Sequence, residues 1–189
     1  NENGKDQARK TFEYLRNIPF NKAFSSSMNR PYETAQIILQ NNNNLEIEKI
    51  DSLVEISHGL WEGKLEAEIR EKWPILLKNW HDKPEEVIMP EGESIKDVSE
   101  RSIEAFNKIC LSQKDNDLTL LVAHDAVNKT LICNILGINY SNIWMIKQGN
   151  GGITIIDLFN DPSKPAVISA LNITTHLGGI IDSTASGAL

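Results

Sequence analysis

The sequence predicts an α/β fold in which helices cover a largely parallel sheet. Short apolar or alternating segments, typical of strands, take turns along the chain with segments whose apolar residues recur at helical spacing. One junction is especially clear, because the apolar run at residues 118–123 passes directly into a helical pattern. The 189 residues, 40% of them hydrophobic, suffice for one domain with a sizeable core. We expect this domain at residues 1–177 and a tail or linker at residues 178–189.

The first half of the chain contains alternating predicted helices and strands. Pro31 suits the first turn of a helix, and the segment from Leu45 to Ile50 alternates between apolar and polar residues as a strand does. The predicted elements are helices at 3–16 and 31–40, strands at 22–26 and 45–50, and a helix at 64–78 that Pro74 interrupts.

The second half begins with a predicted loop at residues 81–92, which holds Pro84, Pro90 and Gly92. Ser94 is a good N-cap for a long helix, and Asp97 supplies the acid three residues later. The remaining predicted elements are a helix at 95–112, a strand at 118–123, a helix after residue 124, and strands at 153–159 and 166–171 joined by an Asn-Asp-Pro turn.

Composition excludes several classes of function. The net charge of −7 argues against a nucleic-acid-binding surface, and no apolar stretch approaches the roughly 20 residues of a membrane span. Neither a signal peptide nor a metal-site spacing is visible. Cys110 and Cys133 fall within apolar helical patterns, so we expect two buried free thiols and a cytoplasmic location. The sequence leaves open whether the protein forms a homo-oligomer.

His124 is the first candidate for chemistry, because it lies between a predicted strand and a predicted helix. In open α/β sheets, ligands bind at the carboxyl ends of the strands. The free N–H groups and the positive dipole end of the following helix favour an anion there. The position therefore favours proton or phosphoryl chemistry, the alternative being a hydrogen-bonded core histidine.

Two other segments carry candidate residues. Arg30 stands where a strand end runs into a helix, and a cation there is best explained by an anion bound between its guanidinium and the helix N–H groups. The alternative is a solvated surface arginine. Glu55 or Glu62 would serve as a general acid if desolvation raised its pKa, the alternative being an exposed loop carboxylate. Gly92-Glu93-Ser94 is mainly a capping signal.

Taken together and in order, these segments resemble the motifs of the histidine phosphatase superfamily, also called the phosphoglycerate mutase-like family. The resemblance covers residues 3–171 and rests on four motifs, which are Ser25-Ser-Ser-Met-Asn-Arg30-Pro-Tyr-Glu-Thr-Ala35, Leu53-Val-Glu55 through Gly59-Leu-Trp-Glu-Gly63, Gly92-Glu-Ser94 and Val122-Ala-His124. Each motif is weak alone, but four in the right order with compatible spacing are specific.

The resemblance implies a three-layer α/β/α sandwich with a mostly parallel central sheet. It also implies a phosphomonoesterase that acts on a small phosphorylated metabolite through a phosphohistidine, without a metal or other cofactor. On the matching positions, Arg30 becomes a phosphate clamp, His124 the second histidine of the phosphate pocket and Glu55 the general acid. Ser26 lines the pocket.

The sequence departs from the family at two points. The Arg-His-Gly motif of the family's first strand, which holds the nucleophile, does not occur. We therefore expect a domain incomplete at its N-terminus, with the first strand missing, and a chain inactive by itself. Ser57-His58-Gly59 is a poor substitute because it lies inside the general-acid segment. Asp125 stands where most relatives carry glycine.

Two alternatives remain within this interpretation. One is a phosphoglycerate mutase, although the short connection at residues 64–91 favours a site open to water and hence hydrolysis. The other is a non-catalytic domain that binds phosphate or a partner, because the chain lacks the nucleophile motif.

Overall fold

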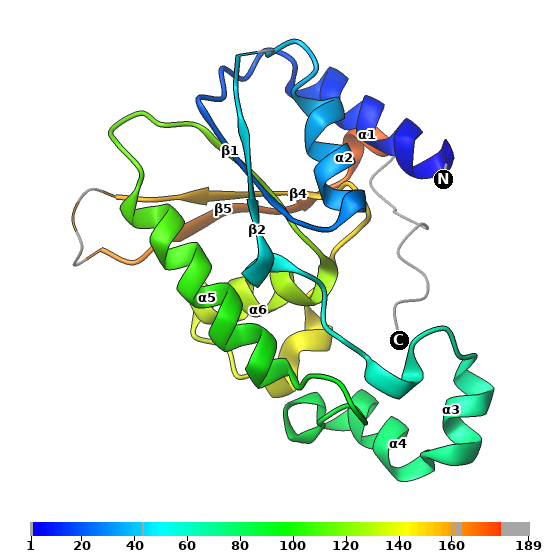
Figure 1. Cartoon of the computed structure of the whole chain (residues 1–189). Helices are drawn as coiled ribbons and strands as arrows, with labels where there is room; N and C mark the ends of the chain where they lie inside the picture. The colour runs from blue at the N-terminus through cyan, green and yellow to red at the C-terminus, as the bar shows by residue number, and fades with distance from the viewer. Residues whose placement is uncertain (1, 43, 160, 162–163, 179–189) are drawn as a thin grey trace.

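The computed structural model describes residues 2–42, 44–159, 161 and 164–178 (Figure 1). Apart from Asp161, the predicted Asn-Asp-Pro turn lies outside these residues, and apart from Gly178 so does the predicted tail at 178–189. Within the described residues, no helix is both long and apolar enough to cross a membrane.

Three parallel strands form the central sheet. β1 (Lys22–Ser26) lies between β2 (Ile47–Ile50) and β3 (Thr119–Val122). Ser25 of β1 is in register with Lys49 on one side and Val122 on the other. Because the strands are parallel, their carboxyl ends meet at one edge of the sheet. That edge brings together segments that are about 100 residues apart in the sequence.

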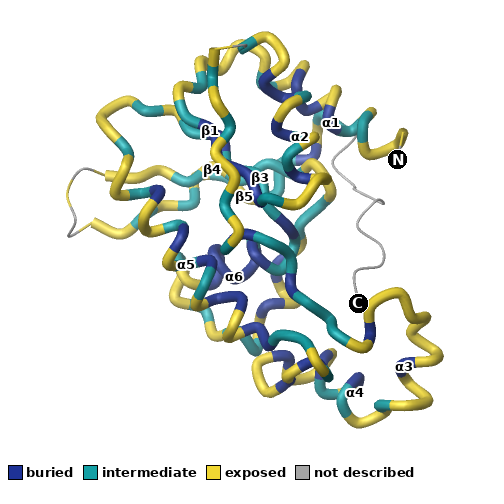
Figure 2. Tube along the Cα trace, viewed as in Figure 1, coloured by how far each residue is buried: buried dark blue, intermediate teal, exposed yellow. Residues whose placement is uncertain are grey.

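Helices cover both faces of this sheet. The faces are distinguished by alternate strand residues, because successive side chains of a strand point to opposite sides. Ala23 and Leu120 pack in one apolar cluster with α2 (Asn29–Ile38), which lies against α1 (Glu2–Leu15). Phe24 and Leu121 face a second, larger cluster. That cluster contains residues of α5 (Ile95–Leu111) and α6 (Asp125–Leu136). The predicted three-layer arrangement is confirmed (Figures 1 and 2).

The last two strands do not join this sheet. β4 (Ile153–Asp157) and β5 (Val167–Ile173) pair antiparallel with each other, with an irregular register between Ile153 and Ile156. In the described part of the chain, β3 pairs only with β1, and β4 only with β5. Both strands lie where the sequence predicted strands, although β5 extends two residues further.

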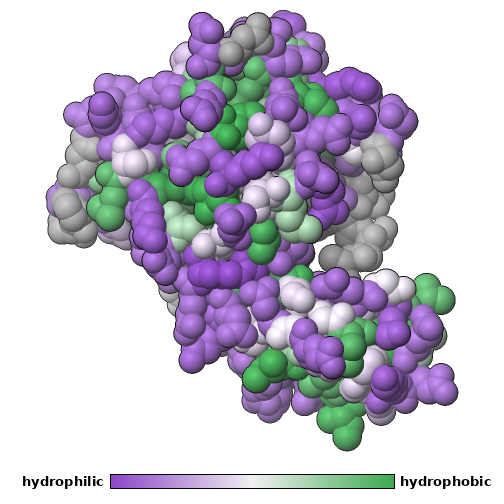
Figure 3. Space-filling model, viewed as in Figure 1, coloured by the Kyte–Doolittle hydropathy of each residue, from purple (hydrophilic) through white to green (hydrophobic). Residues whose placement is uncertain are grey.

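The predicted helix at 64–78 is two helices. α3 (Glu66–Lys72) ends at Trp73, and Pro74 begins α4 (Pro74–Asp82) because its fixed φ suits a first helical turn. α4 continues into the region predicted to be a loop, where burial of Trp80 supports it. The lobe that contains both helices exposes apolar side chains such as Leu65 and Ile75 (Figure 3).

Three boundaries next to the predicted site follow local signals. α2 begins at Asn29, two residues before the expected Pro31, so Arg30 is its second residue. Ser94 caps α5, accepting a hydrogen bond from the Asp97 N–H, as predicted. α6 starts immediately after His124, also as predicted.

The two cysteines differ in burial. Cys133 is buried, as predicted, but Cys110 is only partly buried, which corrects the expectation for it. Cys110 lies at the last turn of α5, where the helix leaves the core. Both are free thiols.

Candidate active site

The carboxyl edge of the sheet brings Ser26, Arg30 and His124 together. Ser26 ends β1, Arg30 lies in the first turn of α2, and His124 follows β3. Nε2 of His124 lies 2.9 Å from the Ser26 hydroxyl, and Nδ1 lies 3.4 Å from Nη2 of Arg30. These contacts fit the tautomer that donates from Nε2 to Ser26 and accepts at Nδ1 from Arg30.

His124 is uncharged at neutral pH in this arrangement. Burial, followed by the charges of Arg30 and Arg101, lowers the pKa of its imidazole to about 4. Only 4% of the residue is exposed. A bound anion would act in the opposite direction, because a nearby negative charge stabilises the imidazolium.

Arg30 is exposed and lacks an anionic partner. Within the described ranges, no carboxylate lies within ion-pair distance of its guanidinium. A planar guanidinium can hold two oxygens of a phosphate at once. An unpaired guanidinium in contact with a histidine at the ligand-binding edge of an α/β sheet therefore has the chemistry of an anion site.

Glu55 occupies the N-terminus of α6. Its Oε2 accepts a hydrogen bond from the Asp125 N–H at 3.2 Å, and its Oε1 accepts from Ala126 at 3.3 Å and Ile56 at 3.0 Å. The anion expected at this helix start is thus the protein's own carboxylate. Burial raises the pKa of Glu55 and the charge of Asp125 adds to this, while the three N–H donors oppose it. A raised pKa is what a proton donor requires.

Glu62, the alternative general acid, lies elsewhere. It is exposed, and its Oε1 accepts a hydrogen bond from the Ser57 hydroxyl at 3.3 Å. Of the two candidate carboxylates, only Glu55 contacts the helix start beside His124.

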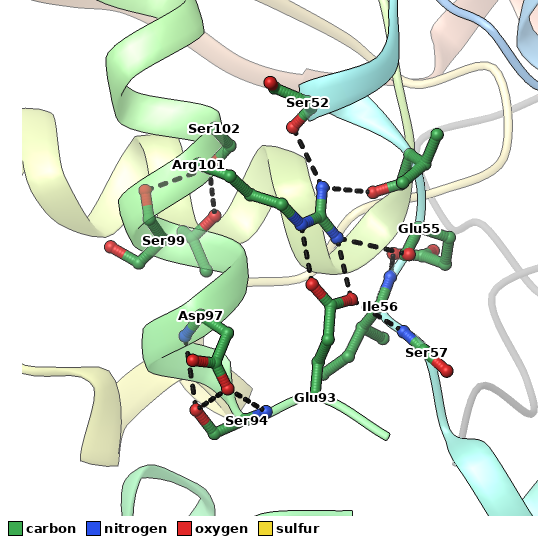
Figure 4. Close-up of polar contacts among 12 residues, drawn as sticks. Ser52, Glu55, Ile56, Ser57, Glu93, Ser94, Asp97, Ser99, Arg101 and Ser102 are labelled. Atoms are coloured by element: carbon green, nitrogen blue, oxygen red, sulfur yellow. Dashed lines mark hydrogen bonds and ion pairs between the residues drawn. The ribbon is translucent and has the colours of Figure 1, made fainter. Parts of the chain in front are cut away.

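A partly buried ion pair between Arg101 and Glu93 holds the turn that carries Glu55 (Figure 4). Arg101 of α5 donates two hydrogen bonds to Glu93, of 2.8 and 2.9 Å. Its guanidinium also donates to the carbonyls of Ser52, Val54 and Glu55. Glu93 in turn accepts from the Ser57 N–H at 2.9 Å. The pair therefore fixes the backbone on both sides of Glu55.

Comparison with known proteins establishes the family. A family model of the histidine phosphatase superfamily (branch 1) matches residues 1–170. The chain belongs to this superfamily. Phosphoserine phosphatase 1 of Hydrogenobacter thermophilus is 32% identical over 177 residues, which is 94% of this histidine phosphatase and 82% of the relative.

Two solved structures extend the comparison. Bacillus stearothermophilus YhfR superimposes on this histidine phosphatase with a TM-score of 0.86 and 25% identity, covering 94% of this chain and 86% of that one. A mutant phosphoserine phosphatase from Entamoeba histolytica, solved with phosphoserine, superimposes with a TM-score of 0.74 and 27% identity. The match covers 91% of this chain and 83% of that one. The fold that the motifs implied is confirmed. The class of reaction is hydrolysis of a phosphoric monoester.

His58 of this histidine phosphatase lies away from the contacts among Ser26, Arg30 and His124. It precedes the short 3-10 turn η2 (Gly59–Trp61) and meets the ring of Trp80 edge-on, with 6.1 Å between centroids. Burial lowers the pKa of His58. No described contact joins it to Arg30 or His124.

Arg101 was not among the predicted site residues, and Gly92-Glu93-Ser94 was predicted only to cap a helix. The available signal was spacing, because Arg101 lies seven residues, or two helical turns, after Ser94 and so on the same side of the helix. In the described part of the chain, no group of three or more His, Cys, Asp or Glu side chains has a metal-binding arrangement.

Proposed function

We propose that this chain binds the phosphoryl group of a small phosphomonoester between Arg30, His124 and Ser26 and protonates the leaving oxygen from Glu55. One observation carries the proposal. An arginine without a carboxylate partner contacts a buried histidine at the sheet edge, and a carboxyl group with a raised pKa lies at the adjoining helix start.

Phosphoryl transfer depends mainly on positioning and on stabilising the charge of the equatorial oxygens. Arg30 supplies a fixed positive charge and two parallel donors. His124 supplies an N–H donor at Nδ1 once it is protonated, and the contact of its Nε2 with the Ser26 hydroxyl holds the ring in position. The phosphate charge raises the pKa of both His124 and Glu55, which favours a proton on each.

The nucleophile is the one role that we assign to no residue of this chain. The family's phosphohistidine forms within an Arg-His-Gly motif, which the 189 residues do not contain. His58 lies in the Glu55 segment and has no arginine beside it. We therefore expect the 189-residue chain to bind phosphate with negligible turnover. Substantial hydrolysis that His58→Ala abolishes would contradict this assignment.

Phosphoserine is the first substrate to test, because two similar proteins are named for it. The alternative is mutase activity on phosphoglycerate. In a longer protein that includes an Arg-His-Gly segment, hydrolysis releases inorganic phosphate, whereas a mutase interconverts 3- and 2-phosphoglycerate. Interconversion without phosphate release would contradict the assignment as a hydrolase.

Location and assembly are also proposals. Two free thiols without a disulfide favour the cytoplasm. Exposed apolar side chains on β4 and β5, such as Ile155 and Leu171, favour a homo-oligomer, which light scattering measures.

Isothermal titration with inorganic phosphate tests the site. Arg30→Ala should weaken binding by about tenfold or more, because a charge-assisted contact contributes about 1.5–3 kcal/mol. Arg16→Ala is the matched control, since Arg16 is an exposed arginine paired with Glu13 on α1. Equal loss in both variants, or no binding to the unmodified chain, would refute the proposed phosphate site.

A further inference from the structure

Unpartnered polar atoms gather around one small cavity beside Glu55. In the described part of the chain, five buried side-chain nitrogen or oxygen atoms lack a hydrogen-bond partner. Three of them, Nε2 of His58, Nε1 of Trp80 and Oδ1 of Asp125, belong to residues that line this one cavity. Because buried polar groups in proteins are almost always hydrogen-bonded, this concentration indicates a ligand that all three atoms share.

The size of the cavity limits the ligand to a single heavy atom. The volume is about 30 Å³, which is about the volume that one water molecule occupies in the liquid. Ile95 and Ile143 form part of the wall and are only 1% and 0% exposed. Because both belong to the larger apolar cluster, the cavity cannot widen without disturbing a close-packed core.

The two ring nitrogens of His58 have different roles. Burial lowers the pKa of the imidazole, while the charge of Glu62 and a hydrogen bond with the backbone of Ile56 oppose this change. Since Nε2 has no partner, the bond to Ile56 belongs to Nδ1. A hydrogen bond that raises the pKa of a histidine is donated by its ring, so Nδ1 carries the proton of the neutral imidazole. Nε2 is therefore an acceptor.

The three atoms together require a neutral group that both donates and accepts. Nε2 of His58 and Oδ1 of Asp125 are acceptors, and the Trp80 indole N–H is a donor. The Asp125 charge is already balanced by Lys129, whose Nζ lies 2.9 Å from Oδ2. A cation would leave the buried indole N–H unpaired, and an anion would leave both acceptors unpaired. Water has the two hydrogens and the lone pair that this set needs, and about three hydrogen bonds are typical of a buried water.

We propose that this cavity binds one water molecule, which accepts a hydrogen bond from the Trp80 indole and donates to Nε2 of His58 and Oδ1 of Asp125. The water links three elements, because Trp80 belongs to α4, His58 precedes η2 and Asp125 begins α6. It therefore connects the lobe of α3 and α4 to the helix start that binds Glu55. None of its bonds involves Arg30 or His124, so the inference goes beyond the proposed function and does not depend on it.

Nuclear magnetic resonance on the nitrogen-15-labelled 189-residue chain detects the water directly. A long-lived water gives a rotating-frame Overhauser peak at the Trp80 indole proton, with a sign opposite to that of a proton-exchange peak. Trp80→Phe assigns the indole resonance. We expect the water peak in the unmodified chain and in the control His81→Phe, because His81 is exposed on α4, and its loss in His58→Phe. An unmodified chain without the peak, or a peak that His58→Phe leaves unchanged, would overturn the proposal.

The tautomer of His58 is a second measurement, and it needs no variant. Nitrogen-15 chemical shifts distinguish a protonated ring nitrogen from an unprotonated one. We expect an unprotonated Nε2 and a protonated Nδ1 at neutral pH. A proton on Nε2 would overturn the proposal, because His58 could not then accept a hydrogen bond from the water.

A double-mutant cycle tests whether His58 and Asp125 share the water, since no described contact joins these two side chains. His58→Phe and Asp125→Leu each remove one acceptor, and leucine keeps the branched shape of aspartate. The combined increase in the unfolding equilibrium constant should be about three- to tenfold smaller than the product of the single increases. The control cycle pairs His58→Phe with Glu104→Gln on the exposed side of α5, where the product should hold within about twofold. Equal deviations in the two cycles would overturn the proposal.

Discussion

The Arg101 guanidinium and the Glu93 carboxylate face each other in a two-point ion pair, with hydrogen bonds of 2.8 and 2.9 Å. The side chains are 20% and 25% exposed, so water screens the pair only in part. Both partners also contact the backbone around Glu55. The position of the proposed proton donor therefore depends on an ion pair that contains neither a phosphate ligand nor the donor itself.

Glu93→Gln should destabilise the fold. The substitution leaves the partly buried Arg101 without its counter-ion, which costs about 2–3 kcal/mol for a group at this exposure. Urea denaturation measures the change in the free energy of unfolding. Glu104→Gln is the control on the same helix, and the loss of its exposed pair with Lys108 should cost less than about 0.5 kcal/mol. Equal effects would show that the Arg101 pair does not stabilise the turn.

Stability should fall in acid because of His124. The pKa of its imidazole is about 4 in the folded protein, below the ordinary value of 6.5. Its contribution to stability is therefore complete above pH 6.5 and is lost as the pH falls toward 4. We expect a loss of about 2 kcal/mol, below the full linkage value because the neighbouring Arg30 is exposed to solvent.

Unfolding at pH 7 and at pH 4.5 measures this loss. His124→Gln should show a smaller decrease than the unmodified chain, because glutamine does not titrate. His81→Gln is the control, since His81 is exposed on α4. The same decrease in all three proteins would assign the acid sensitivity to other groups.

Asp125→Asn should lower the pKa of Glu55. The charge of Asp125 is the second largest cause that raises this pKa, after burial, and asparagine removes it without changing the side-chain size. Carbon-13 NMR of the side-chain carboxyl measures the titration. Glu62→Gln removes a more distant carboxylate and should leave the Glu55 titration unchanged. A Glu55 pKa that does not move in Asp125→Asn would show that the two carboxyl groups are not coupled.

Two glycines with similar backbone angles should respond differently to alanine. Gly59 has φ +54°, and a Cβ there would lie 2.1 Å from the Pro90 carbonyl oxygen. Gly63 has φ +74°, but a Cβ there meets nothing within 4 Å. Gly63→Ala should cost about 1 kcal/mol from backbone strain alone, whereas Gly59→Ala should cost more than about 3 kcal/mol. Thermal unfolding of the two variants distinguishes them, and equal midpoints would contradict the close approach at Gly59.

The sequence predicted those features that depend on neighbouring residues. The bounds of β1, the Ser94 cap and the start of α6 after His124 all follow from local patterns. The bounds of α2 and α4 were less accurate, because a proline is tolerated anywhere in a first turn and buried tryptophans extend a helix beyond its local signals.

Features that depend on contacts between distant parts of the chain were harder to predict from the sequence. Three of the four motifs placed Arg30, Ser26, Glu55 and His124 in one site by resemblance, and these side chains lie at one edge of the sheet. Spacing places Arg101 on the Ser94 side of α5, but it does not reveal that the guanidinium binds the carbonyls of a turn 46–49 residues earlier in the chain. The residues alone left Glu55 and Glu62 as alternatives and the resemblance favoured Glu55, but its contact with the start of α6 depends on the fold.

The carboxylate of Glu55 at the start of α6 has a consequence for the stoichiometry of binding. A phosphate that reaches Arg30 and His124 meets one neutral imidazole and one carboxylate bonded to helix N–H groups. Its charge draws protons onto both, so association should take up protons from solution. The observed heat will then depend on the ionisation enthalpy of the buffer, and affinity will increase as the pH decreases toward neutrality. In the proposed function, the proton for the leaving oxygen would thus be taken up when the substrate binds, before any bond to phosphorus breaks.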